Sequence, residues 1–146
     1  MQLEAATQLL YRQVPLLRHT DVRVTALQRD AVQLSAPLAA NGNHHGTAFG
    51  GSLSMLGIVA GWLLAYVGQD VDEPTTNIVI ADSHTRYLRP LRGDLLIEAH
   101  WRADDGKRYR AQLAAGRKAD ITIQCRAGDA DAAAIRQDSR FVAIPL

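Results

Sequence analysis

Cysteine is nearly absent from this sequence: Cys125 is the only one among 146 residues. A single cysteine cannot form an internal disulfide or build a cysteine-based metal site. The surrounding segment ITIQC alternates apolar and polar residues, so we expect Cys125 to be a small core residue rather than a nucleophile. A lone free cysteine is also compatible with a reducing cytosol.

An excess of either charge is missing as well. The chain has 16 basic and 15 acidic side chains, which gives a net charge of +1. Binding to a nucleic-acid backbone needs a concentrated basic surface, so the composition gives no electrostatic case for a nucleic-acid partner. Hydrophobic residues make up 47% of the chain, which suits the core of one domain over residues 1–146.

Several sequence signals are also lacking. The N-terminal segment MQLEAATQLLYRQ has acidic and polar residues where an export signal has a basic flank and an apolar run. With the free cysteine, this predicts a cytoplasmic location. The chain has no GxxxxGK loop, and its Gly-Gly pair does not match a dinucleotide fingerprint. The five histidines lack a nearby ligand set, so we predict neither a metal nor a cofactor.

Formal charge is absent from one long stretch, between His45 and Asp70. Its length is close to that of a transmembrane helix. However, the stretch opens with GTAFGG, contains interior serines and glycines, and has no flanking Lys or Arg to orient it in a bilayer. We therefore predict no membrane span, but a helix from Ser52 to Val67 that is apolar all round and surrounded by protein on every side.

The rest of the chain has mainly the patterns of strands. Alternation with period two indicates about six strands, in the segments 21–38 (a hairpin turning at 28–30), 76–90, 94–103, 119–127 and 132–146. Short helices are expected before Pro15 and over 104–116, the second with an Asp N-cap and a stop at Gly116. A helix that is apolar on every face needs a sheet that curls around it, so the predicted class is α+β.

The segment 76–90 carries the most distinctive strand, and 94–103 is predicted to be its hairpin partner. Strict alternation places Asp82 and Arg86 on the same face as Ile78 and Ile80, and Ser83 on the opposite face. A carboxylate within such an apolar stretch is costly unless it is paired or used in catalysis. Asp82 is thus either a salt-bridge partner of an arginine or a catalytic base. Only one of Asp82 and Ser83 can reach a site on one side of the sheet, and we prefer Asp82.

Three segments together resemble a known family. NHHGTAFGGS at 43–52, the apolar helix with its Gly61-Trp62 pair, and TRYLRPLRGD at 85–94 resemble the hotdog-fold acyl-CoA thioesterases. The similarity is greatest to the thioesterase family typified by the C-terminal domain of YiiD, and it covers nearly the whole chain. It implies an antiparallel sheet wrapped around a long buried central helix. It also implies a homodimer or dimer of dimers, with an acyl-CoA or acyl-carrier-protein substrate bound between two subunits.

Thioester hydrolysis needs one group that stabilises an oxyanion and another that orients water. A helix N-terminus supplies unpaired amides for the first task, and Gly51 N–H is our candidate, although the glycines can equally serve only a tight turn. For the second task, the resemblance implies Asn43. His45 is a candidate base because histidine titrates near neutral pH, while the alternative for His44 and His45 is solvated polarity.

Further substrate contacts are predicted from the same segments: Asn41, Phe49, Gly50, Ser83, Arg86 and Arg89. Arginines in RYLRPLR suit the phosphates of coenzyme A, or they decorate a solvated face. One departure from the resembled family is clear, because many hotdog thioesterases carry a carboxylate two turns into the helix, where this chain has Ile58. The alternatives are therefore a non-catalytic acyl-CoA-binding or acyl-chain-binding module, or a dehydratase, which also normally uses that acid.

Overall fold

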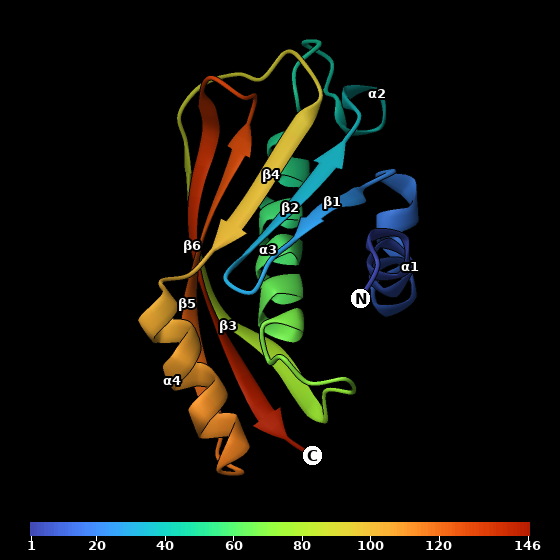
Figure 1. Ribbon diagram of the computed structural model, residues 1–146. Coiled ribbons are helices and arrows are strands. Elements are labelled where there is room, and N and C mark those ends of the chain that lie inside the picture. Colours follow the sequence, from blue (N-terminus) through green and yellow to red (C-terminus); the bar gives the residue numbers. More distant parts are fainter.

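The computed structural model of the protein covers residues 1–146 (Figure 1). Six strands form one antiparallel sheet in the order β1-β2-β4-β5-β6-β3. Their bounds are Arg23–Leu27 (β1), Ala31–Ala36 (β2), Thr76–Tyr87 (β3), Leu95–His100 (β4), Ala119–Gly128 (β5) and Ala133–Pro145 (β6). The hairpin predicted within 21–38 is confirmed, with its turn between β1 and β2.

The central helix α3, Gly50–Val67, runs along the inside of this curved sheet (Figure 1). It contacts β4, β5 and β6 most, and its buried side chains form the centre of one hydrophobic core. Gly61 allows close packing, since an added Cβ would lie 2.7 Å from the Phe141 ring. By length and composition α3 could cross a membrane, yet half of it is buried within the protein, as in a core helix. The predicted α+β arrangement of a sheet around an apolar helix is confirmed.

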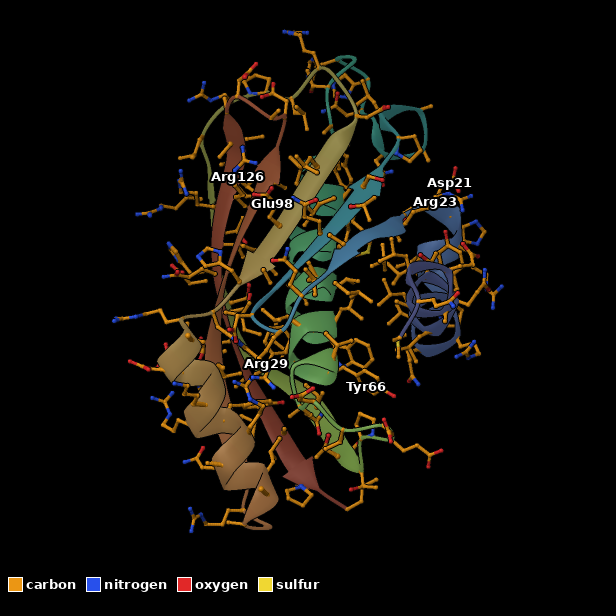
Figure 2. All side chains as sticks on the ribbon, in the orientation of Figure 1. Asp21, Arg23, Arg29, Tyr66, Glu98 and Arg126 are labelled. Carbon is orange, nitrogen blue, oxygen red and sulfur yellow. The ribbon has the colours of Figure 1, made fainter.

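One face of α3 is less covered than predicted. Met55, Ile58, Trp62 and Tyr66 are only partly buried and recur at helical spacing. Tyr66 projects from α3 on the side away from β5 and β6 (Figure 2). The expectation that protein surrounds the helix on every side is therefore wrong for the single chain, because the sheet curls around only part of its circumference.

The predicted pairing of 76–90 with 94–103 is also wrong. β3 pairs with β6 at the edge of the sheet, whereas β4 lies between β2 and β5. Length explains the choice: β3 has 12 residues and β6 has 13, while β4 has only 6. Long-range pairing with β6 thus gives β3 far more backbone hydrogen bonds than a local hairpin would.

Three further helices lie outside this layer. α1, Leu3–Gln13, packs beside β1 and is followed by a 3₁₀ turn at Pro15–His19. α2, Leu38–Asn41, is a single turn that was not predicted. α4, Ala103–Ala114, packs on β5 and ends before Gly116, whose φ of 72° suits the predicted stop. The predicted Asp N-cap is wrong, because Arg102 occupies that position and no side chain caps the helix.

Candidate active site

The first turn of α3 presents unpaired backbone amides. Leu53 N–H is the first to bond back, to the Phe49 carbonyl at 3.1 Å, whereas Gly50, Gly51 and Ser52 N–H have no acceptor in the protein. No side chain caps this end of the helix. Three amides without partners at the positive end of a helix dipole form a site that favours negative charge.

Two aromatic side chains flank these amides. The ring of Phe49, which is 55% exposed, lies against the bare Cα of Gly51, where any Cβ would collide with it. Tyr87, at the end of β3, donates a hydrogen bond from its hydroxyl to the Gly50 carbonyl at 3.2 Å. A side chain at position 51 would therefore displace the exposed Phe49 ring, and Tyr87 ties the helix start to the edge of the sheet.

A hollow of about 360 Å³ opens beside this helix start. It is lined by Thr47, Ala48, Gly50, Leu53, Tyr87, Leu88, Arg89, Pro90 and Leu91. Of the predicted site residues, Gly50 and Arg89 meet here, and Tyr87 is a lining residue that sequence reasoning missed. Neither Asn43 nor His45 lines the hollow.

Asn43 organises the loop that precedes α3. Its Oδ1 accepts hydrogen bonds from the backbone N–H groups of His45, at 2.9 Å, and of Thr47, at 3.2 Å. Its Nδ2 donates to Thr47 Oγ1 at 2.9 Å. The side chain is thus engaged in an Asx turn. His45 is exposed in the same loop and its ring lies 3.8 Å from that of His44, centroid to centroid.

Asn41 has a structural role that the sequence did not predict. It is 1% exposed, and its Nδ2 donates to the carbonyls of Thr20, at 2.8 Å, and Pro37, at 2.9 Å. The main-chain carbonyl of Asn41 accepts a hydrogen bond from the Phe49 N–H. The prediction that Asn41 contacts substrate is therefore wrong for this structure: the side chain is sealed inside, where it holds the loop against the N-terminal part of the chain.

A β-bulge reverses the predicted faces of β3. The register with β6 shifts between Ile80 and Asp82, so one residue, Ala81, is extra. Ile78 and Ile80 face inward, opposite Ala143 and Phe141, and after the bulge Ser83 faces inward opposite the buried Ser139. Ser83 Oγ and Ser139 Oγ lie 2.9 Å apart.

Asp82 consequently lies on the outer face of the sheet. Its side chain is 67% exposed and accepts a hydrogen bond from Arg140 Nε at 3.0 Å. The prediction that Asp82 rather than Ser83 points into the site is wrong, because the bulge breaks strict alternation. The salt-bridge alternative holds, and this geometry gives no reason to retain Asp82 as a base.

Polar side chains on the inner face continue past Ser83. Thr85 lies opposite Gln137 of β6, which is 2% exposed, and Gln137 Nε2 donates to Thr85 Oγ1 at 2.9 Å and to the Ser54 carbonyl at 3.0 Å. Sequence reasoning missed this cluster. A signal was available, since Gln137 shares its period-two register with the buried Ile135 and Phe141.

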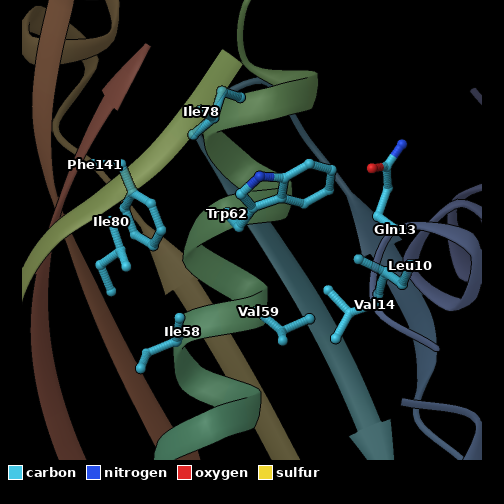
Figure 3. Close-up of a pocket in the computed structure, with 9 residues that line it drawn as sticks. All are labelled: Leu10, Gln13, Val14, Ile58, Val59, Trp62, Ile78, Ile80 and Phe141. Carbon is cyan, nitrogen blue, oxygen red and sulfur yellow. The ribbon is translucent and has the colours of Figure 1, made fainter. Parts of the chain in front are cut away.

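An apolar groove of about 260 Å³ runs along the uncovered face of α3 (Figure 3). Its lining joins α1, α3, β3 and β6 through Leu10, Gln13, Val14, Ile58, Val59, Trp62, Ile78, Ile80 and Phe141. Trp62 and Ile58 project into it from α3 (Figure 3). Eight of the nine lining residues are hydrophobic, so the groove suits a hydrocarbon chain.

Arginines form a row on the outer face of the sheet. Arg86 lies opposite Arg136, which in turn lies opposite Arg126. Arg126 pairs with Glu98 at 3.7 Å (both labelled in Figure 2), whereas Arg86 and Arg136 form no salt bridge. Like charges on directly opposed residues destabilise a sheet unless an anion compensates them. Arg86 is thus available to an anion, but from the opposite face to the hollow that Arg89 lines.

Cys125 is 4% exposed and its thiol donates to the Gly57 carbonyl at 3.2 Å. Burial, reinforced by the charge of Asp138, raises the pKa of the Cys125 thiol to about 12. The thiol therefore stays protonated near neutral pH, which confirms Cys125 as a core residue. No group of three or more His, Cys, Asp or Glu side chains comes together to hold a metal ion.

Comparison with known proteins agrees with this geometry. A family model described as "Putative thioesterase (yiiD_Cterm)" matches residues 3–145. A structure described as the putative thioesterase from Shewanella oneidensis is 25% identical, with a TM-score of 0.83 over 98% of this chain and 97% of that chain.

Two more distant structures show the same fold. A protein of unknown function from Pseudomonas aeruginosa, described as a probable thioesterase, is 20% identical with a TM-score of 0.82 and covers 98% and 95% of the two chains. A thioesterase from Haemophilus influenzae is 17% identical with a TM-score of 0.74 and covers 100% and 92%. The sheet wrapped around α3 is the hotdog fold of these proteins. The chain therefore belongs to the thioesterase family typified by the C-terminal domain of YiiD.

Proposed function

We propose that this chain is an acyl thioesterase that hydrolyses acyl-CoA or acyl-carrier-protein thioesters. The observation that carries the proposal is the set of unpaired amides at Gly50, Gly51 and Ser52, beside a hollow open enough for a ligand. Negative charge collects on a thioester carbonyl oxygen as a nucleophile attacks. Amides fixed in place before the reaction stabilise that charge more than they stabilise the neutral carbonyl.

The reaction joins the oxygen of a water molecule to the thioester carbonyl carbon and then breaks the C–S bond. One proton of the water ends on the leaving sulfur, and the other remains with the carboxylic acid until solvent removes it. In this proposal Gly51 N–H is the main donor to the carbonyl oxygen, and Phe49 packs against the thioester group. His45 takes up the water proton in passing, while Asn43 positions the loop.

The apolar groove is the proposed site of the acyl chain. It begins at Ile58, two turns after the amides, and extends towards Trp62 and α1. A chain bound there would replace water on apolar surface, a gain of roughly 0.8 kcal/mol per buried methylene group. The phosphates of coenzyme A are proposed to meet Arg89 at the hollow, with the pantetheine passing close to Ser83, and to reach Arg86 only where the ligand crosses the edge of β3 to the outer face.

A homodimer, alone or within a dimer of dimers, is part of the same proposal. β3 is an edge strand with unpaired backbone groups, and Val79 and Ile80 on it are 46% and 42% exposed. A second copy placed along β3 would also cover the partly buried face of α3 that carries Met55, Ile58, Trp62 and Tyr66. Size-exclusion chromatography with light scattering tests this: Ile80→Lys should yield monomers where the wild type yields dimers, and a monomeric wild type would contradict it.

The second candidate is a binding module that holds acyl-CoA or an acyl chain without turnover. The observation that favours it is the absence of a carboxylate on α3, where Ile58 faces the groove. The dehydratase alternative, which would need that same acid, gains no support from the site. We place either activity in the cytoplasm, since a single buried free thiol is compatible with a reducing compartment.

Thiol release from a panel of acyl-CoA thioesters, detected with a thiol reagent, separates the candidates. The panel should span short, medium and long saturated chains and an enoyl thioester, each measured with wild type and with a no-enzyme control. Thiol release above the control supports the thioesterase. Saturable binding of acyl-CoA by calorimetry without thiol release would support the binding module instead, and hydration of the enoyl chain would support a dehydratase.

A further inference from the structure

The buried amide of Gln137 lies one helical turn past the unpaired amides of α3. Its Nε2 donates to the Ser54 carbonyl at 3.0 Å and to Thr85 Oγ1 at 2.9 Å, and it lies 3.4 Å from Ser54 Oγ, which can only share one of the same two hydrogens. Its Oε1 has no hydrogen-bond partner and rests against the bare Cα of Gly57. A buried acceptor without a partner costs about 1–3 kcal/mol of stability, and such a cost is typical of side chains with a functional role.

The orientation of this amide is fixed by its contacts. The Ser54 carbonyl can only accept a hydrogen bond, so the group that faces it must be the nitrogen. The two hydrogens of that nitrogen point to the Ser54 carbonyl and to Thr85 Oγ1, the shorter contacts, and Ser54 Oγ at 3.4 Å only shares one of them. Each hydroxyl therefore keeps its proton and at least one lone pair, and neither proton has an acceptor in the protein.

The two hydroxyls come from different elements beside the start of α3. Ser54 lies on α3, one turn after Gly50 and Gly51 and one turn before Ile58, and Thr85 lies on the edge strand β3. Both residues are half-buried. Both oxygens lie within 3.4 Å of the Gln137 nitrogen, which brings the two hydroxyls together at one place between α3 and β3.

We propose that the hydroxyls of Ser54 and Thr85 hold the water that attacks the thioester, and that Gln137 is the positioning residue that orients both. The inference rests on the proposed thioesterase function and adds the nucleophile's site to it. Water that accepts a hydrogen bond from one hydroxyl and donates one to the other keeps a lone pair free. That lone pair attacks the carbonyl carbon, the C–S bond breaks, and the protons move as described above.

We call the pair of hydroxyls at Ser54 and Thr85 the water cradle. Substitutions that delete one hydroxyl with little change in side-chain shape test it. Thr85→Val and Ser54→Ala should each lower kcat for hydrolysis about ten-fold with little change in KM, the order expected for one lost hydrogen bond. Thr122→Val, on the exposed outer face of β5, is the matched control and should leave kcat unchanged. Thr85→Val with wild-type kcat would overturn the assignment.

Gln137→Met tests the positioning role. If Gln137 acts only through the two hydroxyls, the substitution Gln137→Met should lower kcat no further when it is added to the Thr85→Val/Ser54→Ala double variant. A merely structural glutamine would lower kcat in both backgrounds alike. Hydroxylamine provides a second readout, because a strong added nucleophile does not need the cradle: hydroxamate formation should fall less than hydrolysis in all three variants, and an equal fall would contradict the proposal.

A crystal structure at high resolution separates this inference from the proposed activity. We expect one ordered water within hydrogen-bond distance of Ser54 Oγ and Thr85 Oγ1 in the wild type, and none there in Thr85→Val. No water at that position would overturn the cradle even if the protein hydrolyses thioesters. Water at that position in a protein without thiol release would show that the hydroxyls bind water but would refute both the thioesterase and the role of this water as its nucleophile.

Discussion

Removal of a single amide hydrogen at the start of α3 is the sharpest test of the proposed chemistry. Proline at position 51 deletes the N–H, and the first turn of a helix tolerates proline because its N–H groups have no helical partner. The new side chain would collide with the Phe49 ring, so the change must be made in a Phe49→Ala background. The matched variant, Phe49→Ala/Gly51→Ala, adds a Cβ in the same place but keeps the amide hydrogen.

The expected size of the effect follows from the donors that remain. Loss of one oxyanion donor typically costs about 2.7–4 kcal/mol, or 10²–10³ in kcat. The amides of Gly50 and Ser52 are also unpaired and can share the charge, so we expect the lower end of this range. The proline variant should therefore hydrolyse acyl-CoA about 100-fold more slowly than the alanine variant.

Steady-state thiol release from one acyl-CoA, with kcat and KM determined separately, measures this difference. KM should be similar in the two variants because both lack the Phe49 ring and share the groove. Circular dichroism and thermal unfolding verify that both are folded. Equal kcat values in two folded variants would refute the idea that the Gly51 amide stabilises the oxyanion.

Three other predictions follow from the same structure. Asp82→Asn should leave kcat unchanged and the free energy of unfolding within about 1 kcal/mol, because its pair with Arg140 is exposed; activity assays and urea unfolding measure both. Gly61→Ala should lower the free energy of unfolding, measured in urea, by roughly 1–3 kcal/mol, because the new Cβ would lie 2.7 Å from the Phe141 ring. Phe141→Leu in the Gly61→Ala background should restore part of that loss. Burial raises the pKa of Cys125 from 9.0 to about 12, so its contribution to stability is full below pH 9.0 and is lost as pH rises towards 12. The unfolding midpoint of the wild type should fall over that range more steeply than that of Cys125→Ala.

Sequence reasoning predicted the features that depend on local pattern. The uncharged run ending at Val67 identified the central helix because no other arrangement hides so much apolar surface without a membrane. Most strand segments followed from alternation, and the buried state of Cys125 followed from its place within one. The glycines at the helix start are predicted to hold the oxyanion because a helix N-terminus supplies amides without helical partners, and the structure does leave those amides unpaired.

Features that depend on distant contacts were not predictable in the same way. The pairing of β3 with β6 joins segments far apart in sequence, so no local signal favours it over a hairpin with β4. No glycine or other local sequence signal predicts the bulge at Ala81, yet the bulge moves Asp82 outward and Ser83 inward. Asn41 looks like any loop asparagine until its partners at Thr20 and Pro37 are known.

The extra residue in β3 also gives the strand two chemical halves. Ahead of the bulge the inward side chains are hydrocarbon, at Ile78 and Ile80; beyond it they carry hydroxyls, at Ser83 and Thr85. A molecule with one apolar end and one polar end would therefore bind along this strand in one orientation only, with its apolar end beside the isoleucines and its polar end beside the hydroxyls. If Ala81 instead paired within a regular ladder, Asp82 and His84 would turn towards the helix and the polar half would carry charge; deletion of Ala81 would keep Ser83 and Thr85 inward, so the two halves depend on the register and not on the extra side chain.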